Sequence, residues 1–199
     1  MTRGAPVASE YEAIQAVVRG DARGLEFLVA QHELRALRIA VAITGNRGMA
    51  EEAVAEAFFN VYKHADRFEP GRQFGPWFTK IVVNEAVHVA RRARRAERLQ
   101  ALLGRQVPHS ADPVEVAEGN ELRREVIAAV HSLSPNERAA ITLRYLLDLD
   151  ERSVAEILGW PLGTLKTRLH RARTRLRSRL QDRMGRHLEV GAPQQEPLG

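Results

Sequence analysis

The sequence contains no cysteine and no long apolar run. Without cysteine, the chain cannot form a disulfide bond, a cysteine-ligated zinc site or a thiol redox switch. No segment approaches the roughly 18 consecutive apolar residues of a membrane-spanning helix, and residues 1–10 lack the apolar core of a secretory signal. We therefore expect a soluble protein of the cytoplasm that does not insert into a membrane.

The sequence also lacks the residue patterns that are typical of enzymes. It shows no nucleophile with a matching base, no pair of carboxylates and no set of metal ligands, and its 14 glycines form no phosphate-binding loop. His170 has no second histidine or acid at ligand spacing in its segment, so we interpret it as a surface residue. We expect a protein that is not an enzyme, with no cofactor, no metal and no small-molecule substrate.

Positive charge is concentrated in two short segments. Residues 91–98 contain five arginines and one glutamate, and residues 166–179 contain seven basic residues and no acid. These segments contribute +4 and +7, so the rest of the chain must carry about −6 to reach the formal net charge of +5. This distribution is typical of a protein that contacts a polyanion at two places, although two solvated helix faces would give the same pattern.

Nearly the whole sequence follows the apolar periodicity of α-helices, and no alternating strand pattern competes with it. Glycine and proline interrupt the periodicity between residues 99 and 119, which predicts a linker. The pattern predicts helices near residues 10–19, 22–43, 47–64, 74–98, 120–131, 135–147 and 151–158, and a last one from about 162. We therefore expect an all-α chain of two small helical domains, at 1–98 and 120–183, joined by a flexible linker at 99–119 and followed by a disordered tail at 184–199.

The segment at 148–179 has the form of a helix-turn-helix. Asp150 can cap a short helix that ends at Gly159, and a second helix begins near Leu162 after a tight turn. Two short helices joined by a turn that contains glycine are the pattern of a helix-turn-helix. A basic amphipathic helix that lies on another protein or on a membrane would lack the capped helix and the glycine turn before it.

The second helix of this unit has one apolar side and one basic side. Apolar residues recur at spacings of four, three and four, which predicts a buried stripe of Leu165, Leu169, Ala172 and Leu176. The other side carries hydroxyl, imidazole and cationic groups, which can contact base edges and phosphates in the major groove. We predict DNA contacts from Thr164, Lys166, Thr167, Arg168, His170, Arg171, Arg173 and Arg175, with Arg177 as a further phosphate contact.

Two ordered sets of motifs run through the chain. The second half contains SPNER at 134–138, LRY at 143–145, VAEILG at 154–159 and GTLKTRLHRAR at 163–173. This series resembles the sigma-4 domain of extracytoplasmic-function (ECF, group 4) sigma factors of bacterial RNA polymerase. The first half resembles the sigma-2 domain of the same family through AEE at 50–52, EAF at 56–58, FGPWF at 74–78, Ile81 and Asn84, followed by the arginine cluster.

The resemblance implies a promoter-specificity subunit. Such a protein binds core RNA polymerase, recognises the −35 and −10 promoter elements and helps to initiate transcription, and it is commonly held by an anti-sigma factor. The resemblance places polymerase contacts on the helix at 47–64, at Glu51, Glu52, Glu56, Phe59 and Asn60. It places −10 contacts in the loop at 68–73 and the helix after it, at Phe68, Arg72, Lys80, Asn84, His88, Arg91, Arg92, Arg94 and Arg95.

Two other functions are compatible with the sequence. A stand-alone helix-turn-helix regulator would use only the second domain, and a sigma-like decoy would bind an anti-sigma factor without a promoter.

Two positions also depart from the family pattern, since Ala55 stands where glutamine is common and Arg47 where aspartate is common. Among the aromatic residues, the sequence favours a core position for Trp77 and allows either a core or a base-stacking position for Phe74.

Overall fold

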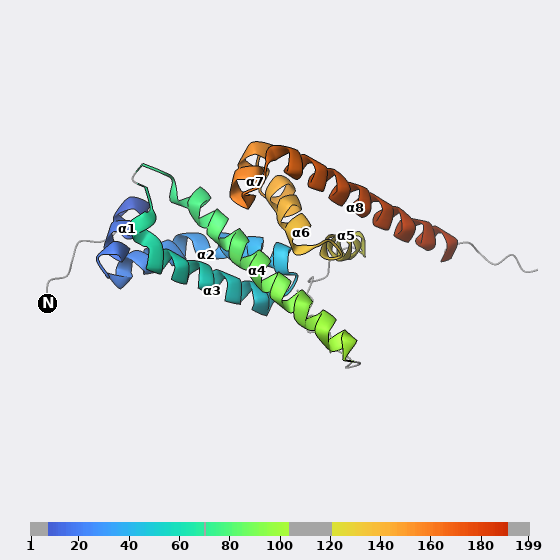
Figure 1. Cartoon of the computed structure of the whole chain (residues 1–199), viewed down its shortest axis with the longest axis horizontal. Coiled ribbons are helices and arrows are strands. Elements are labelled where there is room, and N and C mark those ends of the chain that lie inside the picture. The colour runs from blue at the N-terminus through green and yellow to red at the C-terminus, as the bar shows by residue number, and fades with distance from the viewer. Residues whose placement is uncertain (1–7, 70, 104–120, 191–199) are drawn as a thin grey trace, which may run out of the picture.

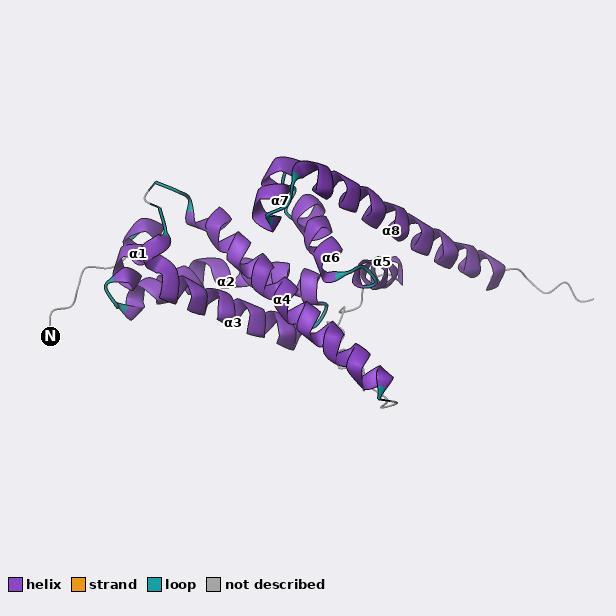
Figure 2. Cartoon of the chain, in the orientation of Figure 1, coloured by secondary structure: helices purple, strands orange, loops and turns teal. Residues whose placement is uncertain are grey.

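The fold was analysed in a computed structural model, which describes residues 8–69, 71–103 and 121–190, with side chains described from residue 123 to residue 181 in the last of these ranges. The regular elements of this part of the chain are helices, which confirms the all-α prediction (Figure 2). No helix among the described residues has the length and apolarity that a bilayer crossing needs.

The helices form two groups that lie side by side (Figure 1). We call the first group domain 2 and the second group domain 4. Domain 2 contains α1 (Glu10–Val18), α2 (Ala22–Thr44), α3 (Arg47–His64), a 3-10 turn at Ala65–Arg67, and α4 (Phe74–Leu102). Domain 4 contains α5 (Glu121–His131), α6 (Pro135–Ile141), a π-helical turn at Thr142–Leu146, α7 (Glu151–Leu158) and α8 (Leu162–Val190).

Domain 2 is built around an aromatic cluster between α2, α3 and α4. The ring of Phe74 stacks on that of Phe78 with centroids 5.3 Å apart, and Phe78 lies 4.6 Å from Phe58. Phe74 is 1% exposed, so the structure assigns it to the core rather than to a base-stacking role. Offset aromatic rings at these distances add stabilisation beyond the apolar area they bury, so this cluster fixes where α4 begins.

Local capping decides where the helices of domain 4 begin and end. The Asp150 carboxylate accepts hydrogen bonds from the backbone N–H groups of Arg152 and Ser153, which starts α7 as predicted. Gly159 ends α7 with φ of +65°, a left-handed conformation that glycine adopts at little cost. The short turn after it brings α8 across α7, so the predicted helix-turn-helix is confirmed.

The core of domain 4 contains the stripe that the sequence predicts on the last helix. Leu165, Leu169 and Ala172 are at most 2% exposed, and Leu176 packs against the same core from its edge. Val154 of α7 is fully buried in that core. Because one side of α8 is buried in this way, its polar and basic side chains must lie on the other side.

One helix extends beyond its predicted bounds. Helix α4 continues to Leu102 instead of ending at residue 98, because residues 96–102 consist of good helix formers and contain no glycine or proline. The linker predicted at 99–119 therefore begins too early, and most of it lies outside the described residues. Helix α8 has the bounds Leu162–Val190, the disordered tail from residue 184 stays a prediction, and residues 191–199 lie outside the described part.

The π-helical turn offers a matched test of the domain 4 core. Leu143 is fully buried, whereas Leu146, three residues later in the same turn, is 58% exposed. We expect Leu143→Ala to lower the free energy of unfolding by about 2–5 kcal/mol, because it leaves a cavity, and Leu146→Ala to change it by less than about 0.5 kcal/mol. Urea unfolding followed by circular dichroism measures both, and equal losses would contradict this description of the core.

Candidate nucleic-acid interface

The first half of α8 presents an exposed basic surface opposite its buried stripe. The side chains of His170, Arg171 and Arg173 are exposed, and none of them has an ion pair or side-chain hydrogen bond to another described residue. α8 contacts α5, α6 and α7 of its own domain, so this surface faces away from domain 2. Cationic and imidazole groups on the outer side of a recognition helix are placed to meet a nucleic-acid groove.

Two of the arginines predicted to bind DNA have partners within domain 4, although the Arg175 side chain remains exposed. The Arg168 guanidinium lies 4.4 Å from the centre of the Trp160 ring, a cation–π contact across the turn. Arg175 Nη1 lies 2.6 Å from Oε1 of Glu137 on α6, and the Glu137 side chain is only 11% exposed. Burial raises the pKa of Glu137, but hydrogen bonds from Ser134 and the Arg175 charge outweigh burial and hold that pKa below its ordinary value. These arginines therefore orient α8 in its domain.

The remaining predicted residues of α8 have weaker internal contacts. Lys166 Nζ lies 3.9 Å from a Glu151 carboxylate oxygen in an exposed pair, which is worth little in water. The Thr167 hydroxyl donates to the Gly163 carbonyl at 3.0 Å, and Thr164 is half-buried. Lys166 and Thr167 are exposed, so both can exchange these contacts for a ligand without opening the domain core.

A polar stripe on α4 matches the residues predicted to meet the −10 DNA. Exposed side chains recur at spacings of four, four and three, so they lie along one side of the helix: Lys80, Asn84, His88 and Arg91. This α4 stripe faces domain 4 across open grooves, and its side chains remain exposed. Arg91 Nη2 donates to Oδ1 of Asn136 on α6 at 2.7 Å, and a groove of about 900 Å³ separates Lys80 and Asn84 from α7. In this arrangement, domain 4 stands where DNA on the α4 stripe would lie.

The Phe68 ring, in the loop before α4, packs into the core of domain 2. The Phe68 side chain is 8% exposed, and its ring lies 5.2 Å from the Trp77 ring and 6.2 Å from the Phe74 ring. The ring thus packs in the aromatic cluster and not towards solvent, and its contact with an unstacked base stays a prediction that requires the ring to move. Arg72 in the same loop is exposed and pairs with Glu69 at 2.8 Å.

The other arginines of α4 point to different neighbours. Arg92 Nη2 pairs with Oε1 of Glu52 on α3, so a residue predicted for DNA contacts one predicted for polymerase. Arg95 is exposed on the outer part of the helix. Arg94 is exposed at the mouth of a separate cavity between the two domains. The arginine cluster is thus spread around α4 rather than gathered on the α4 stripe.

Helix α3 presents an exposed surface that combines acidic and aromatic groups. Glu51, Glu52, Glu56 and Phe59 are exposed, whereas Asn60 is half-buried and donates to Glu85 at 3.0 Å. Arg47, one of the departures from the family pattern, pairs with Glu51 at 2.8 Å. Ala55, the other departure, is exposed on the same helix.

The α3 surface also contains two residues that the sequence reasoning missed. Tyr62 is 53% exposed, and the Lys63 ammonium lies 4.1 Å from the centre of the half-exposed Phe59 ring. The helical spacing of three between Phe59 and Tyr62 could have shown that both rings lie on one side of the helix. An acidic surface with exposed aromatic rings is typical of a protein–protein contact.

The two domains also meet through His131, the last residue of α5. Gly45 ends α2 with φ of +78°, and a Cβ atom at Gly45 would lie 3.0–3.2 Å from atoms of the His131 ring. Glycine adopts this backbone conformation at little cost, and any other residue here would also require the His131 ring to shift by a few tenths of an ångström. Burial, and after it the charge of Arg138, lowers the pKa of His131 below its ordinary value. The neutral ring is therefore the form that suits the domain contact.

Comparison with known families matches both halves of the chain. Residues 28–96 match Sigma-70 region 2, and residues 123–176 match Sigma-70 region 4. Region 2 thus covers most of α2 to α4, and region 4 covers α5 to the basic half of α8.

Curated relatives carry the name of ECF sigma factors. The chain is 33% identical to the ECF RNA polymerase sigma factor SigE of Mycolicibacterium smegmatis. This match covers 77% of the present chain and 60% of SigE. It is 28% identical to the ECF RNA polymerase sigma factor SigW of Bacillus subtilis, where the match covers 85% of this chain and 95% of SigW. A similar match, at 29% identity over 84% of the chain, covers 92% of the sigma-E factor of Escherichia coli K12.

Two solved structures share the fold. One is the sigma factor RpoE of Bartonella quintana in complex with the anti-sigma factor NepR, with a TM-score of 0.58, 22% identity and coverage of 78% of this chain and 96% of that one. The other is CnrH in complex with the cytosolic domain of CnrY, also with a TM-score of 0.58 and 22% identity, over 85% and 96% of the two chains.

The lowered pKa of His131 predicts a pH-dependent domain contact. Docking lowers the pKa of this histidine, so the docked form binds a proton less readily than the separated form. The docked form is therefore most stable at a pH above the ordinary histidine pKa of 6.5. Its stability relative to the separated form decreases as the pH falls from 6.5 towards the lowered pKa. We expect the domains to separate more readily at about pH 5.5 than at about pH 8.

Fluorescence energy transfer can measure this separation, because the chain has no native cysteine and dyes can be attached at two introduced ones, Ala22→Cys on α2 and Ser178→Cys on α8. In the His131→Gln variant the pH dependence should disappear, because the group that titrates is gone. A pH dependence that persists unchanged in this variant would assign the effect to another group.

Proposed function

We propose that this chain, which belongs to the ECF sigma factors of bacterial RNA polymerase, divides promoter recognition between its two domains. Proteins of this family are promoter-recognition subunits and not enzymes. Domain 4 reads the −35 element as duplex DNA, and domain 2 contacts core polymerase and the −10 element. The observation that carries this assignment is the exposed basic side of α8, opposite a fully buried stripe in a capped helix-turn-helix.

In domain 4, the residues that read the −35 element are those left without internal partners. His170, Arg171 and Arg173 are exposed and unpaired among the described residues, and Lys166 and Thr167 have contacts that they can exchange. Arg168 and Arg175 act indirectly, because Trp160 and Glu137 hold them. Residues in the first turns of a recognition helix meet base edges, and those farther along meet phosphates.

In domain 2, the α3 surface docks on core polymerase. The Glu56 carboxylate has no ion pair with another described residue, and the Phe59 ring is half-exposed beside the Lys63 ammonium. Together they present a carboxylate near an accessible ring. Complementary charge guides such a contact, and a partly buried aromatic ring supplies apolar area. Arg47 neutralises Glu51 on the first turn of the same helix, so Glu56 carries more of the charge complementarity.

The α4 stripe meets the −10 element only after the domains separate. Arg91 is bonded to Asn136 of α6, and α7 stands over Asn84 across the groove. Binding to polymerase holds the two domains apart at the spacing of the promoter elements, which releases Lys80, Asn84, His88 and Arg91 for DNA. The docked arrangement is therefore the form of the free protein.

An anti-sigma factor is the partner that holds this free form. The sigma factor RpoE of Bartonella quintana, which shares this fold, was solved in complex with the anti-sigma factor NepR, and CnrH was solved in complex with the cytosolic domain of CnrY. A protein that binds across the two domains would keep both the α3 surface and the α4 stripe from polymerase and DNA. A run-off transcription assay with core polymerase and a library of genomic promoters tests the whole proposal, and DNA binding without any transcript would favour a stand-alone regulator.

Arg171 provides the test of −35 reading. We expect Arg171→Ala to weaken binding of the holoenzyme to its preferred −35 sequence by about 1–3 kcal/mol and to flatten the preference at one or two base pairs. The matched control is Arg177→Ala, an exposed arginine of the same helix, which should weaken binding to all sequences equally. Binding to a randomised −35 library, followed by sequencing, separates the two results. A uniform loss in Arg171→Ala would show that Arg171 contacts phosphate only.

Glu56 provides the test of polymerase docking. We expect Glu56→Lys to weaken binding to core polymerase by about tenfold or more, because it places a positive charge against a basic partner. Glu26→Lys makes the same charge change at an exposed position of α2 and should leave the affinity within about twofold. Titration of the labelled full chain with core enzyme measures both, with circular dichroism as a check of folding. Equal affinity of the two variants would remove Glu56 from the docking surface.

A further inference from the structure

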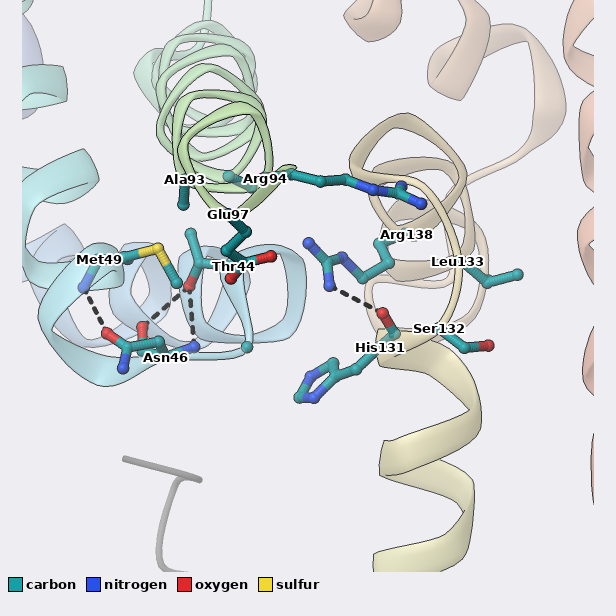
Figure 3. A pocket seen from close by; sticks show the side chains of 12 residues that line it. Thr44, Asn46, Met49, Ala93, Arg94, Glu97, His131, Ser132, Leu133 and Arg138 are labelled. Carbon is teal, nitrogen blue, oxygen red and sulfur yellow. Dashed lines mark hydrogen bonds between the residues drawn. The ribbon is translucent and has the colours of Figure 1, made fainter. Parts of the chain in front are cut away.

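A polar cavity lies between the two domains, away from the α4 stripe. It has a volume of about 420 Å³ and is formed where α2 ends and α3 begins, by the second half of α4, and by the junction of α5 and α6 (Figure 3). Its walls include Thr44 and Asn46 from domain 2 and His131 and Arg138 from domain 4. Cavities of this size are in the range that holds small molecules.

Arg138 is the buried charge of this cavity. Its side chain is 9% exposed, and the guanidinium points into the space between the domains (Figure 3). Nη1 donates to the backbone carbonyl of His131 at 3.1 Å, but the buried Nε atom has no hydrogen-bond partner among the described residues. A buried guanidinium with an unused donor is costly unless an acceptor reaches it. Arg138 thus places on the cavity wall a buried cation that forms no ion pair with a described carboxylate.

A second guanidinium shares the cavity with Arg138. Arg94 reaches in from α4 above Arg138, and the Glu97 side chain comes from the next turn of the same helix (Figure 3). Burial, and after it the Arg94 charge, lowers the pKa of Arg138 to about 10, while Glu97 acts in the opposite direction. With His131 neutral, the described lining residues place two cations against one carboxylate, a positive charge that an anion can balance.

The helix ends at this corner do not supply that charge. The C-terminal end of α2 and the N-terminal end of α3 meet at Gly45 and Asn46, so their dipoles oppose each other. The attraction for an anion therefore comes from the two arginines. Part of the wall is apolar, with Met49, Ala90, Ala93 and Leu133, and this part suits a small organic body beside a charged end.

We propose that this cavity binds a small phosphorylated compound, with its phosphate between Arg94 and Arg138 and its body against the apolar wall. A phosphate monoester carries close to two negative charges and offers several acceptor oxygens, which two guanidinium groups can engage at once. Both guanidinium groups line the cavity, so its oxygens can accept from Arg94 and from Arg138 together. The site uses residues that promoter reading and polymerase docking do not need, apart from Arg94.

Such a ligand links the domains. Arg94 belongs to α4 of domain 2 and Arg138 to α6 of domain 4, so a phosphate that touches both binds only the docked arrangement. A ligand that prefers one arrangement shifts the population towards it by mass action. The compound would keep the α4 stripe covered and delay promoter binding.

Isothermal titration of the full chain with inorganic phosphate tests the site, at constant ionic strength set with chloride. We expect saturable binding that Arg94→Gln weakens by about tenfold and Arg98→Gln by less than about twofold. Arg98 lies one turn farther along α4 and does not line the cavity, so it controls for general charge. Equal weakening by the two variants, or no saturable binding to the unaltered chain, would overturn the proposal.

A variant that binds phosphate more tightly shows that the changes in affinity do not come from loss of folding. Glu97→Gln removes the carboxylate that faces the arginines, and Glu97 is exposed, so we expect phosphate to bind about threefold or more tightly with the fold retained. If this variant weakens binding or separates the domains without phosphate, Glu97 is the internal partner of Arg138 and the proposal fails.

The source of the phosphate is tested with a second compound. Dimethyl phosphate carries a single charge and resembles the phosphodiester of the DNA backbone, so we expect it to bind at least about tenfold more weakly than phosphate. Equal binding of both would assign the site to DNA and overturn the proposal. Phosphate should also increase energy transfer between dyes on α2 and α8, and a decrease would contradict the link between domains. These outcomes do not depend on polymerase or promoter DNA.

Discussion

Helix α4 is packed on both of its sides, and this constraint decides which surfaces of the protein can act. Its inner side carries Phe74, Phe78 and Val82 into the core of domain 2, where each is at most 3% exposed. Its outer side carries the α4 stripe, which lies under α6 and α7. A nucleic acid bound along the α4 stripe, as proposed, would therefore compete with domain 4 for the same surface.

The two sides of α4 differ in how firmly they are packed. Aromatic rings in contact fill the inner side. Opening it would cost about 25 cal/mol of free energy for each Å² of apolar area that becomes exposed. The outer side is bordered by a groove of about 900 Å³ and held by contacts such as the Arg91–Asn136 hydrogen bond. A hydrogen bond of this kind contributes about 0.5–1.5 kcal/mol. The domains can therefore part while each keeps its own core.

The sequence predicted the helices and the helix-turn-helix well, because both depend on local chemistry. Asp150 and Gly159 mark the ends of α7 through capping and backbone freedom, and the spacing of Leu165 and Leu169 sets the buried side of α8. The sequence pattern predicts too early an end for α4. Glycine and proline interrupt the pattern only after residue 103, and the helix formers before them extend the helix to Leu102.

The packing of one domain on the other could not be predicted in this way. Asn84 and Arg91 have the polarity of a DNA contact, and the same polarity suits a groove or a hydrogen bond to Asn136. The packing of Phe68 on Trp77 could not be predicted for a related reason, since an aromatic residue in a loop fits either a base or a core. Local patterns specify the chemistry of a side chain and not the partner that it meets.

The internal pairs of the arginines separate those that can turn to DNA from those that cannot. Arg72 and Arg92 pair with exposed carboxylates, and such pairs contribute about 0–1 kcal/mol, which a phosphate can replace. Arg175 differs because its partner Glu137 is 11% exposed, and removing Arg175 would leave a largely buried carboxylate unpaired. Arg175 therefore stays with α6 when the domains part. Because it fixes α8 against α6, it also sets how Arg171, one turn earlier, is presented on the exposed side of α8.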